Sequence, residues 1–148
     1  MDILVINLHH LSRMRNDPLE RIELLQKAVS LIHLIAGEDA KFYNERLYKC
    51  HLWIAFNYCR LGDLEKTATS LNASLECAVS YESRPERSVY EAYWLSDVED
   101  SREKVWKDHR FSLYEHLLDE VRYSQDFAPF RETTDYKELC RRIEQHIE

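Results

Sequence analysis

The chain has 148 residues, which is the size of one domain and long enough to bury a core without disulfides or metal ions. Its formal net charge is −7 at pH 7, and this acidic balance excludes a typical nucleic-acid-binding domain, which needs Lys and Arg to neutralise phosphates. Charged residues make up 32% of the chain and only two Gly and three Pro interrupt it, so the composition indicates a mostly helical protein.

The sequence contains no run of about 18 apolar residues, so we expect no membrane-spanning helix and no membrane partner. The apolar start at residues 1–6 has an acid at its second position and lacks the basic start and small-residue cleavage site of a signal peptide. No CxxC spacing relates the cysteines, which indicates free thiols of a reducing compartment. We therefore expect a cytoplasmic protein. The cysteines are Cys50, Cys59, Cys77 and Cys140.

Two helices are predicted before residue 37. Residues 3–14 have helical apolar spacing, although residues 3–6 alone could form a strand; helix is favoured because no strand partner follows. Asp17 and Pro18 then provide a capping carboxylate and a first-turn proline for a helix over residues 18–36. Gly37 ends that helix. Residues 1–36 are therefore interpreted as a first helical hairpin.

Residues 40–81 are predicted to form a second helical hairpin, around which the chain is organised. Apolar residues of its first half, such as Leu47 and Ile54, recur at spacings of three and four, while Leu52 and Phe56 lie outside that stripe. A helix that is apolar on most sides is usually sandwiched between others. The turn at residues 61–64 is too short for anything but an antiparallel neighbour, with Gly62 in a left-handed conformation and Asp63 as the next cap.

This hairpin resembles a tetratricopeptide repeat, a helical hairpin of 34 residues. Ala55 stands at the small position of the repeat, Tyr58 at the aromatic position and Leu71 at the large apolar position of the second helix. Thr67 and Ser74 depart from the repeat, which prefers Ala there. The resemblance implies an all-α fold in which tetratricopeptide-like antiparallel hairpins stack as a short right-handed solenoid.

Residues 86–148 are predicted to be a degenerate third unit with capping helices, which completes a single domain over residues 1–148. We expect a short aromatic helix over residues 88–95 and an exposed loop over residues 96–107. Asp108 is predicted to cap the next helix, which extends to about Val121. An apolar connector at residues 127–130 leads to a last helix, capped by Thr134 or Asp135.

The order of these segments resembles the C-terminal region of bacterial transcriptional regulators that carry a phage-repressor-type helix-turn-helix domain before tetratricopeptide-like repeats. The resemblance covers roughly residues 17–140 and depends on the succession ERIELLQKAVSLIHLI, FYNERLY, LGDLEK, YESRP and FAPFRETTDYKEL. It implies a regulatory half that forms a homodimer and senses a peptide or another small effector. The DNA-reading domain has no counterpart in residues 1–16, so we expect no direct nucleic-acid contact by this chain.

Repeats of this type bind partners through the concave side of their inner helices. Two cations there suit a carboxylate and the aromatic rings suit an apolar side chain. The alternative is that the apolar members merely pack on a neighbouring helix. The predicted ligand- or peptide-binding residues are Arg46, Lys49, Leu52, Trp53, Phe56, Asn57 and Arg60.

We expect neither catalysis nor a cofactor. The sequence has no GxSxG motif, no glycine-rich phosphate loop and no HExxH or CxxC metal-binding pattern. The predicted function is therefore a non-catalytic module for protein or peptide interaction and dimerisation, as in the effector half of such a regulator. The alternative is a stand-alone helical-repeat adaptor that binds a partner protein and has no link to transcription.

Overall fold

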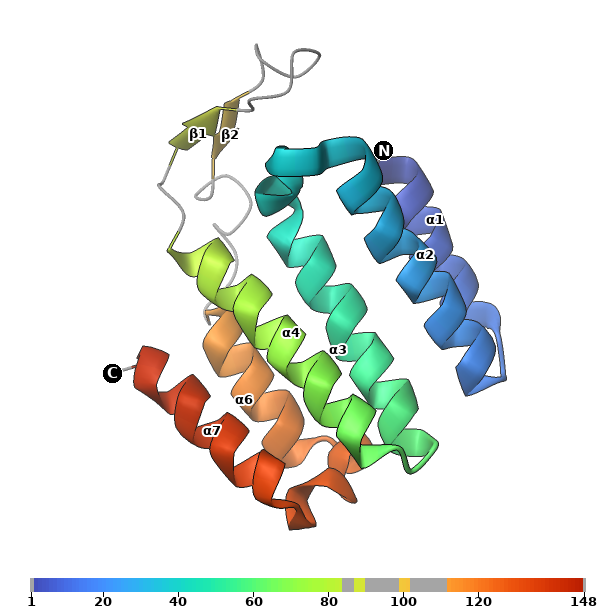
Figure 1. The fold of residues 1–148 in the computed structure, drawn as a ribbon, viewed down its shortest axis with the longest axis vertical. Helices are drawn as coiled ribbons and strands as arrows, with labels where there is room; N and C mark the ends of the chain where they lie inside the picture. The colour runs from blue at the N-terminus through green and yellow to red at the C-terminus, as the bar shows by residue number, and fades with distance from the viewer. Residues whose placement is uncertain (1, 84–86, 90–98, 102–111, 148) are drawn as a thin grey trace.

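The computed structural model describes residues 2–83, 87–89, 99–101 and 112–147 of the chain. Within these ranges the protein is all-helical in class, as predicted, and its six α-helices pack in sequence order. Figure 1 shows them as a row that starts with α1 at one edge and ends with α7 at the other, so that the two termini are far apart. No helix in the described part of the chain has the length and apolar character needed to cross a bilayer.

The first two helices, α1 (Asp2–Met14) and α2 (Pro18–Ala36), are antiparallel neighbours, as the sequence predicted. The Asp17 carboxylate accepts a hydrogen bond from the backbone N–H of Leu19 at 3.0 Å and caps α2. Gly37, with φ of +53°, ends α2 and begins the 3₁₀ helix η1 (Gly37–Tyr43).

The central pair, α3 (Asn44–Arg60) and α4 (Leu64–Glu82), has the most extensive contact of any two helices in the described residues. Gly62 has φ of +76°, in the left-handed region that the sequence predicted for this turn. The buried Ser74 hydroxyl of α4 donates to the Tyr48 carbonyl of α3 at 3.0 Å. This polar departure from the repeat pattern therefore has its hydrogen bond satisfied.

Helix α3 contributes to two separate cores, which confirms that it is sandwiched between other helices. Tyr48, Leu52 and Ala55 belong to a cluster shared with α4, α6 and α7. Leu47 and Ile54 belong to a second cluster, shared with α1 and α2. Burial of apolar surface on both sides fixes α3 as the structural centre of the protein.

The prediction of a helix over residues 88–95 is wrong at its start. Residues Arg87–Val89 form strand β1, which pairs antiparallel with β2 (Glu99–Ser101). Residues 90–95 lie outside the described residues, as do residues 96–98 and 102–107 of the predicted loop. The loop prediction is wrong at residues 99–101, which form β2. The three residues of β1 are paired with the three residues of β2 in an antiparallel ladder. Their backbone is therefore extended and cannot belong to a helix.

Two further helices close the far end of the row. Helix α6 (Leu113–Tyr123) is capped by Ser112, not by the predicted Asp108: Ser112 and Glu115 form a reciprocal capping box, which satisfies two free N–H groups. Helix α7 (Thr134–Ile147) is capped by the hydroxyl of Thr133, which accepts from the N–H of Tyr136 at 3.1 Å, and not by Thr134 or Asp135.

The connector between α6 and α7 contains the short 3₁₀ helices η3 (Gln125–Phe127) and η4 (Phe130–Glu132). Phe127 and Phe130 are fully buried in the cluster that α3 and α4 share with α6 and α7, as predicted for an apolar connector. These rings anchor the C-terminal helices on the central hairpin.

Candidate functional site

Helices α1 and α3 enclose a small hollow of about 200 Å³. Val5, Ile6 and Cys50 provide apolar lining, while Arg46 and Lys49 of α3 are two of the predicted site residues. Its volume is below the range of about 300–1,000 Å³ that is usual for a drug-sized ligand, so it suits one side chain or terminal group of a larger partner. The complete lining is Val5, Ile6, His9, His10, Arg13, Arg46, Lys49 and Cys50.

The hollow collects positive charge in a protein whose net charge is −7. Neither Arg13 nor Arg46 has an ion pair or a side-chain hydrogen bond among the described residues. Lys49 is paired with Glu45 one turn earlier on α3, and its side chain remains 43% exposed. Two guanidinium groups are therefore available for an anionic ligand from outside.

The same positive charges affect the pKa of His9. Burial lowers the pKa of His9, and the positive charges of Arg13, His10, Lys49 and Arg46 lower it further. These charges come from both helices that line the hollow. Burial and the positive neighbours thus keep His9 neutral. The same positive neighbours attract an anion to the hollow.

Aromatic side chains continue from the hollow along α3. The rings of His9 and Trp53 meet edge to face with centroids 6.1 Å apart, and the rings of Trp53 and Phe56 are 5.2 Å apart. The Arg60 guanidinium lies over the Phe56 ring, 5.8 Å from its centroid. We call the surface formed by Arg13, Arg46, Lys49, Trp53, Phe56 and Arg60 the α1–α3 face.

Two of the predicted site residues lie beneath this face. Leu52 is only 8% exposed and belongs to the core shared with α4, α6 and α7. Asn57 is 1% exposed, and its amide nitrogen donates to the carbonyl of Trp53 at 2.7 Å, while its Oδ1 has no partner. Both residues support the position of α3 and are not placed to touch a ligand directly.

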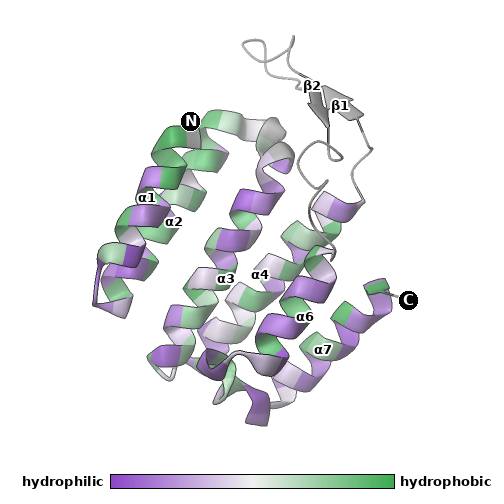
Figure 2. Ribbon diagram, turned by 180° about the vertical axis from the view of Figure 1, so that it is seen from behind, coloured by the Kyte–Doolittle hydropathy of each residue, from purple (hydrophilic) through white to green (hydrophobic). Residues whose placement is uncertain are grey.

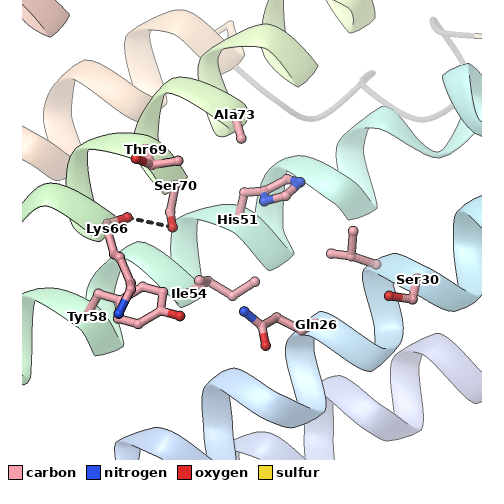
Figure 3. Close-up of a pocket in the computed structure, with 10 residues that line it drawn as sticks. Gln26, Ser30, His51, Ile54, Tyr58, Lys66, Thr69, Ser70 and Ala73 are labelled. Atoms are coloured by element: carbon pink, nitrogen blue, oxygen red, sulfur yellow. Dashed lines mark hydrogen bonds between the residues drawn. The ribbon is translucent and has the colours of Figure 1, made fainter. Parts of the chain in front are cut away.

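A second, larger hollow of about 540 Å³ lies between α2, α3 and α4 (Figure 3). Its only Lys or Arg, Lys66, is held by Asp63 at 2.8 Å and lies 5.3 Å from the centroid of the Tyr58 ring. The Ser70 hydroxyl donates to the carbonyl of Lys66, as the dashed line in Figure 3 marks. Burial lowers the pKa of His51. Apart from Lys66, which is already paired with Asp63, the side chains that line this hollow are uncharged.

The smaller hollow contains site residues that the sequence did not predict, namely His9, His10 and Arg13. They lie on α1, and the alignment of α1 beside α3 has no local signal in the sequence. Only the three-dimensional packing of α1 beside α3 brings them to the hollow. In the described part of the chain, no group of three or more His, Cys, Asp and Glu residues is placed to hold a metal ion.

Comparisons of the chain with protein-family models, with curated protein sequences and with solved structures find no match. The role of the α1–α3 face therefore has to be inferred from its own geometry and charge.

Proposed function

We propose that this chain is a non-catalytic interaction module that binds an acidic protein or peptide on its α1–α3 face and also self-associates. Its helices are proposed to be tetratricopeptide-like hairpins of a short right-handed solenoid. The resemblance to bacterial regulators makes it the effector half of such a protein, and the alternative is a stand-alone adaptor that uses the same face. Both versions share the α1–α3 face as the binding surface.

The observation that carries the proposal is the convergence of Arg13, Arg46 and Lys49 on one hollow of an otherwise acidic protein. Two of these three cations have no acidic partner in the described structure. Arg13 is exposed and Arg46 is half-buried, so an anion from solvent can reach both guanidinium groups. A carboxylate of the partner forms charge-assisted hydrogen bonds with Arg.

The adjoining aromatic surface supports a polypeptide partner over a free anion. Trp53 and Phe56 are only half-buried and extend the site away from the hollow. Arg60 adds a further cation over the Phe56 ring. A peptide that alternates acidic and apolar side chains matches this alternation of cationic and aromatic groups.

The proposal is tested with a fluorescein-labelled peptide that alternates glutamate and leucine, followed by fluorescence polarisation. The double variant Arg46→Glu with Lys49→Glu should weaken binding by about tenfold or more, because it reverses the charge of the hollow. A peptide with glutamine in place of glutamate should bind the unaltered chain weakly.

The matched control is Lys137→Glu with Arg141→Glu on α7, which makes the same change in net charge on exposed residues away from the hollow. This variant should bind the acidic peptide nearly as well as the unaltered chain. Equal affinity of the two double variants, or no binding to the unaltered chain, would overturn the proposed site.

A further inference from the structure

The first hairpin carries most of the exposed large hydrophobic side chains of the described residues. Of the ten large hydrophobic side chains that are exposed in the described residues, seven lie on α1 or α2. Leu34 is 83% exposed and Ile3 is 78% exposed. Such a concentration at one end of a molecule marks a surface that is normally covered. The seven are Ile3, Leu4, Leu11, Met14, Leu19, Leu34 and Ile35.

Charged residues are absent from the same part of the hairpin. Residues 3–12 and residues 28–37 contain no Asp, Glu, Lys or Arg, although these residues make up 32% of the chain. Because α1 and α2 are antiparallel, the first half of α1 lies beside the second half of α2, and Figure 2 shows hydrophobic residues gathered there. Depletion of charge is the compositional signature of the core of a protein interface.

This surface is distinct from the α1–α3 face. On α1, Val5 and Ser12 are buried seven residues apart on the inner side, whereas Leu4 and Leu11 are exposed, also seven residues apart. On α2, Leu34 and Ile35 are exposed next to the buried Ile32 and Ala36. We use the term terminal apolar face for the exposed apolar residues of these two uncharged stretches, namely Ile3, Leu4, Leu11, Leu34 and Ile35.

We propose that the terminal apolar face binds the same face of a second copy of this chain. This inference rests on the self-association part of the proposed function and is independent of peptide binding. Two hairpins that meet face to face around a two-fold axis form a four-helix bundle, a common way to bury one apolar side of each hairpin. The opposite end of the row already has α6 and α7 packed on the central hairpin.

A second copy fits this face better than a bilayer does. Helices that lie on membranes are rich in Lys and Arg on their polar side, and they are attracted to anionic lipids. Here the hairpin carries no basic residue within residues 3–12 or 28–37, and the whole chain has a net charge of −7. A two-fold axis places one uncharged surface against an identical one without pairing like charges.

The size of the face sets the expected strength of the dimer. The uncharged stretch over residues 28–37 is about 15 Å long, and two helices side by side are about 20 Å wide. Two such faces together bury roughly 600 Å², which is below the size of a typical stable interface. We therefore expect a reversible dimer whose population depends on concentration.

The test is sedimentation equilibrium of the whole chain over a dilution series. The unaltered chain should approach twice its mass of 17.8 kDa at high concentration. The double variant Leu4→Glu with Leu34→Glu should weaken the dimer by about tenfold or more per substitution, because each carboxylate would be buried without a partner. Both side chains are more than half exposed, so the circular dichroism of the monomer should not change.

The matched control is Leu61→Glu with Tyr123→Glu, which adds the same charge at exposed apolar residues of other elements and should leave the dimer intact. A monomeric unaltered chain would overturn both self-association and this face. A dimer that persists in the Leu4→Glu, Leu34→Glu variant would overturn this face alone, leaving self-association elsewhere. Equal weakening by the control variant would also overturn it. Binding of the glutamate–leucine peptide, measured in parallel, should be the same in all three proteins.

Discussion

The phenolic oxygen of Tyr48 lies 2.6 Å from Nδ1 of His116, which joins α3 to α6 across 68 residues of sequence. Tyr48 is almost fully buried, and burial raises its pKa, so the phenol keeps its proton. It can donate this hydrogen bond when His116 carries its own proton on Nε2. The two rings also meet edge to face with centroids 5.8 Å apart. The contact fixes α6 on the central hairpin.

Tyr48→Phe should lower the free energy of unfolding by about 1 kcal/mol, because it removes this hydrogen bond and keeps the ring. The cost is moderate since His116 is exposed and can bond to water instead. Urea unfolding followed by circular dichroism measures the change. Tyr123→Phe is the control, since Tyr123 is 73% exposed, and it should have no effect. Equal stability of Tyr48→Phe and the unaltered chain would show that the contact contributes nothing.

The helix ends that depend on neighbouring residues were predictable from the sequence. Asp17, Gly37, Gly62 and Asp63 all act where the sequence placed them, because a cap or a left-handed turn needs only the residues around it. The two-sided burial of α3 was also predictable, since its apolar residues exceed one stripe. These features are local, and a single sequence contains them.

Other features depend on which of several nearby residues caps a helix, or on how far one helix is shifted along its neighbour. The cap of α6 is Ser112 and not Asp108, although Ser112 and Glu115 have the spacing of a capping box, which was the signal that could have decided it. In the binding site, Arg46 and Lys49 were identified from their own helix. Their neighbour Arg13 was not, because its place depends on how far α1 is shifted along α3.

Binding of the glutamate–leucine peptide should tighten as the pH falls. His9 has a lowered pKa in the free protein because of burial and of Arg13, His10, Lys49 and Arg46. It is therefore neutral above its ordinary value of 6.5, and an anion beside it favours the protonated form. Between about pH 7.5 and about pH 5.5, the affinity should rise by about threefold to tenfold while the peptide carboxylates stay ionised.

The same measurement on His9→Gln should give a flatter pH dependence, because the variant cannot gain this proton. His146→Gln on α7 is the control and should behave as the unaltered chain, since His146 stacks on Tyr114 away from the hollow. An identical pH dependence in the unaltered chain and in His9→Gln would mean that His9 does not face the bound anion.

Alkaline pH should destabilise the protein through two thiols. Burial raises the pKa of Cys50 from 9.0 to about 11 and that of Cys77 from 9.0 to about 12. Above pH 9 the unfolded thiols lose protons that the folded ones keep, so the unfolded state binds fewer protons and the free energy of unfolding falls as the pH rises. From pH 7 to about pH 10 the two thiols should contribute a loss of about 3 kcal/mol.

The double variant Cys50→Ala with Cys77→Ala isolates this effect. Its stability at pH 7 should be lower, since the buried Cys50 and the half-buried Cys77 are shortened. It should nevertheless lose less stability than the unaltered chain between neutral and alkaline pH. Guanidinium unfolding at each pH gives both values. If the two proteins lost the same amount, titration of other groups would account for the alkaline destabilisation.

Asp63 should stabilise the central hairpin mainly as a cap. Its carboxylate accepts a hydrogen bond from the backbone N–H of Lys66 at 3.1 Å and pairs with the Lys66 ammonium at 2.8 Å. The Lys66 side chain is 61% exposed and that of Asp63 is 33% exposed, so solvent screens the ion pair and it should contribute little. Loss of the cap acceptor should cost about 1 kcal/mol. Asp63→Ala should therefore lower the urea midpoint with an unchanged m-value, while Asp63→Asn, which keeps an acceptor oxygen but not the charge, should lower it far less. Equal losses in the two variants would assign the stabilisation to the ion pair and not to the cap.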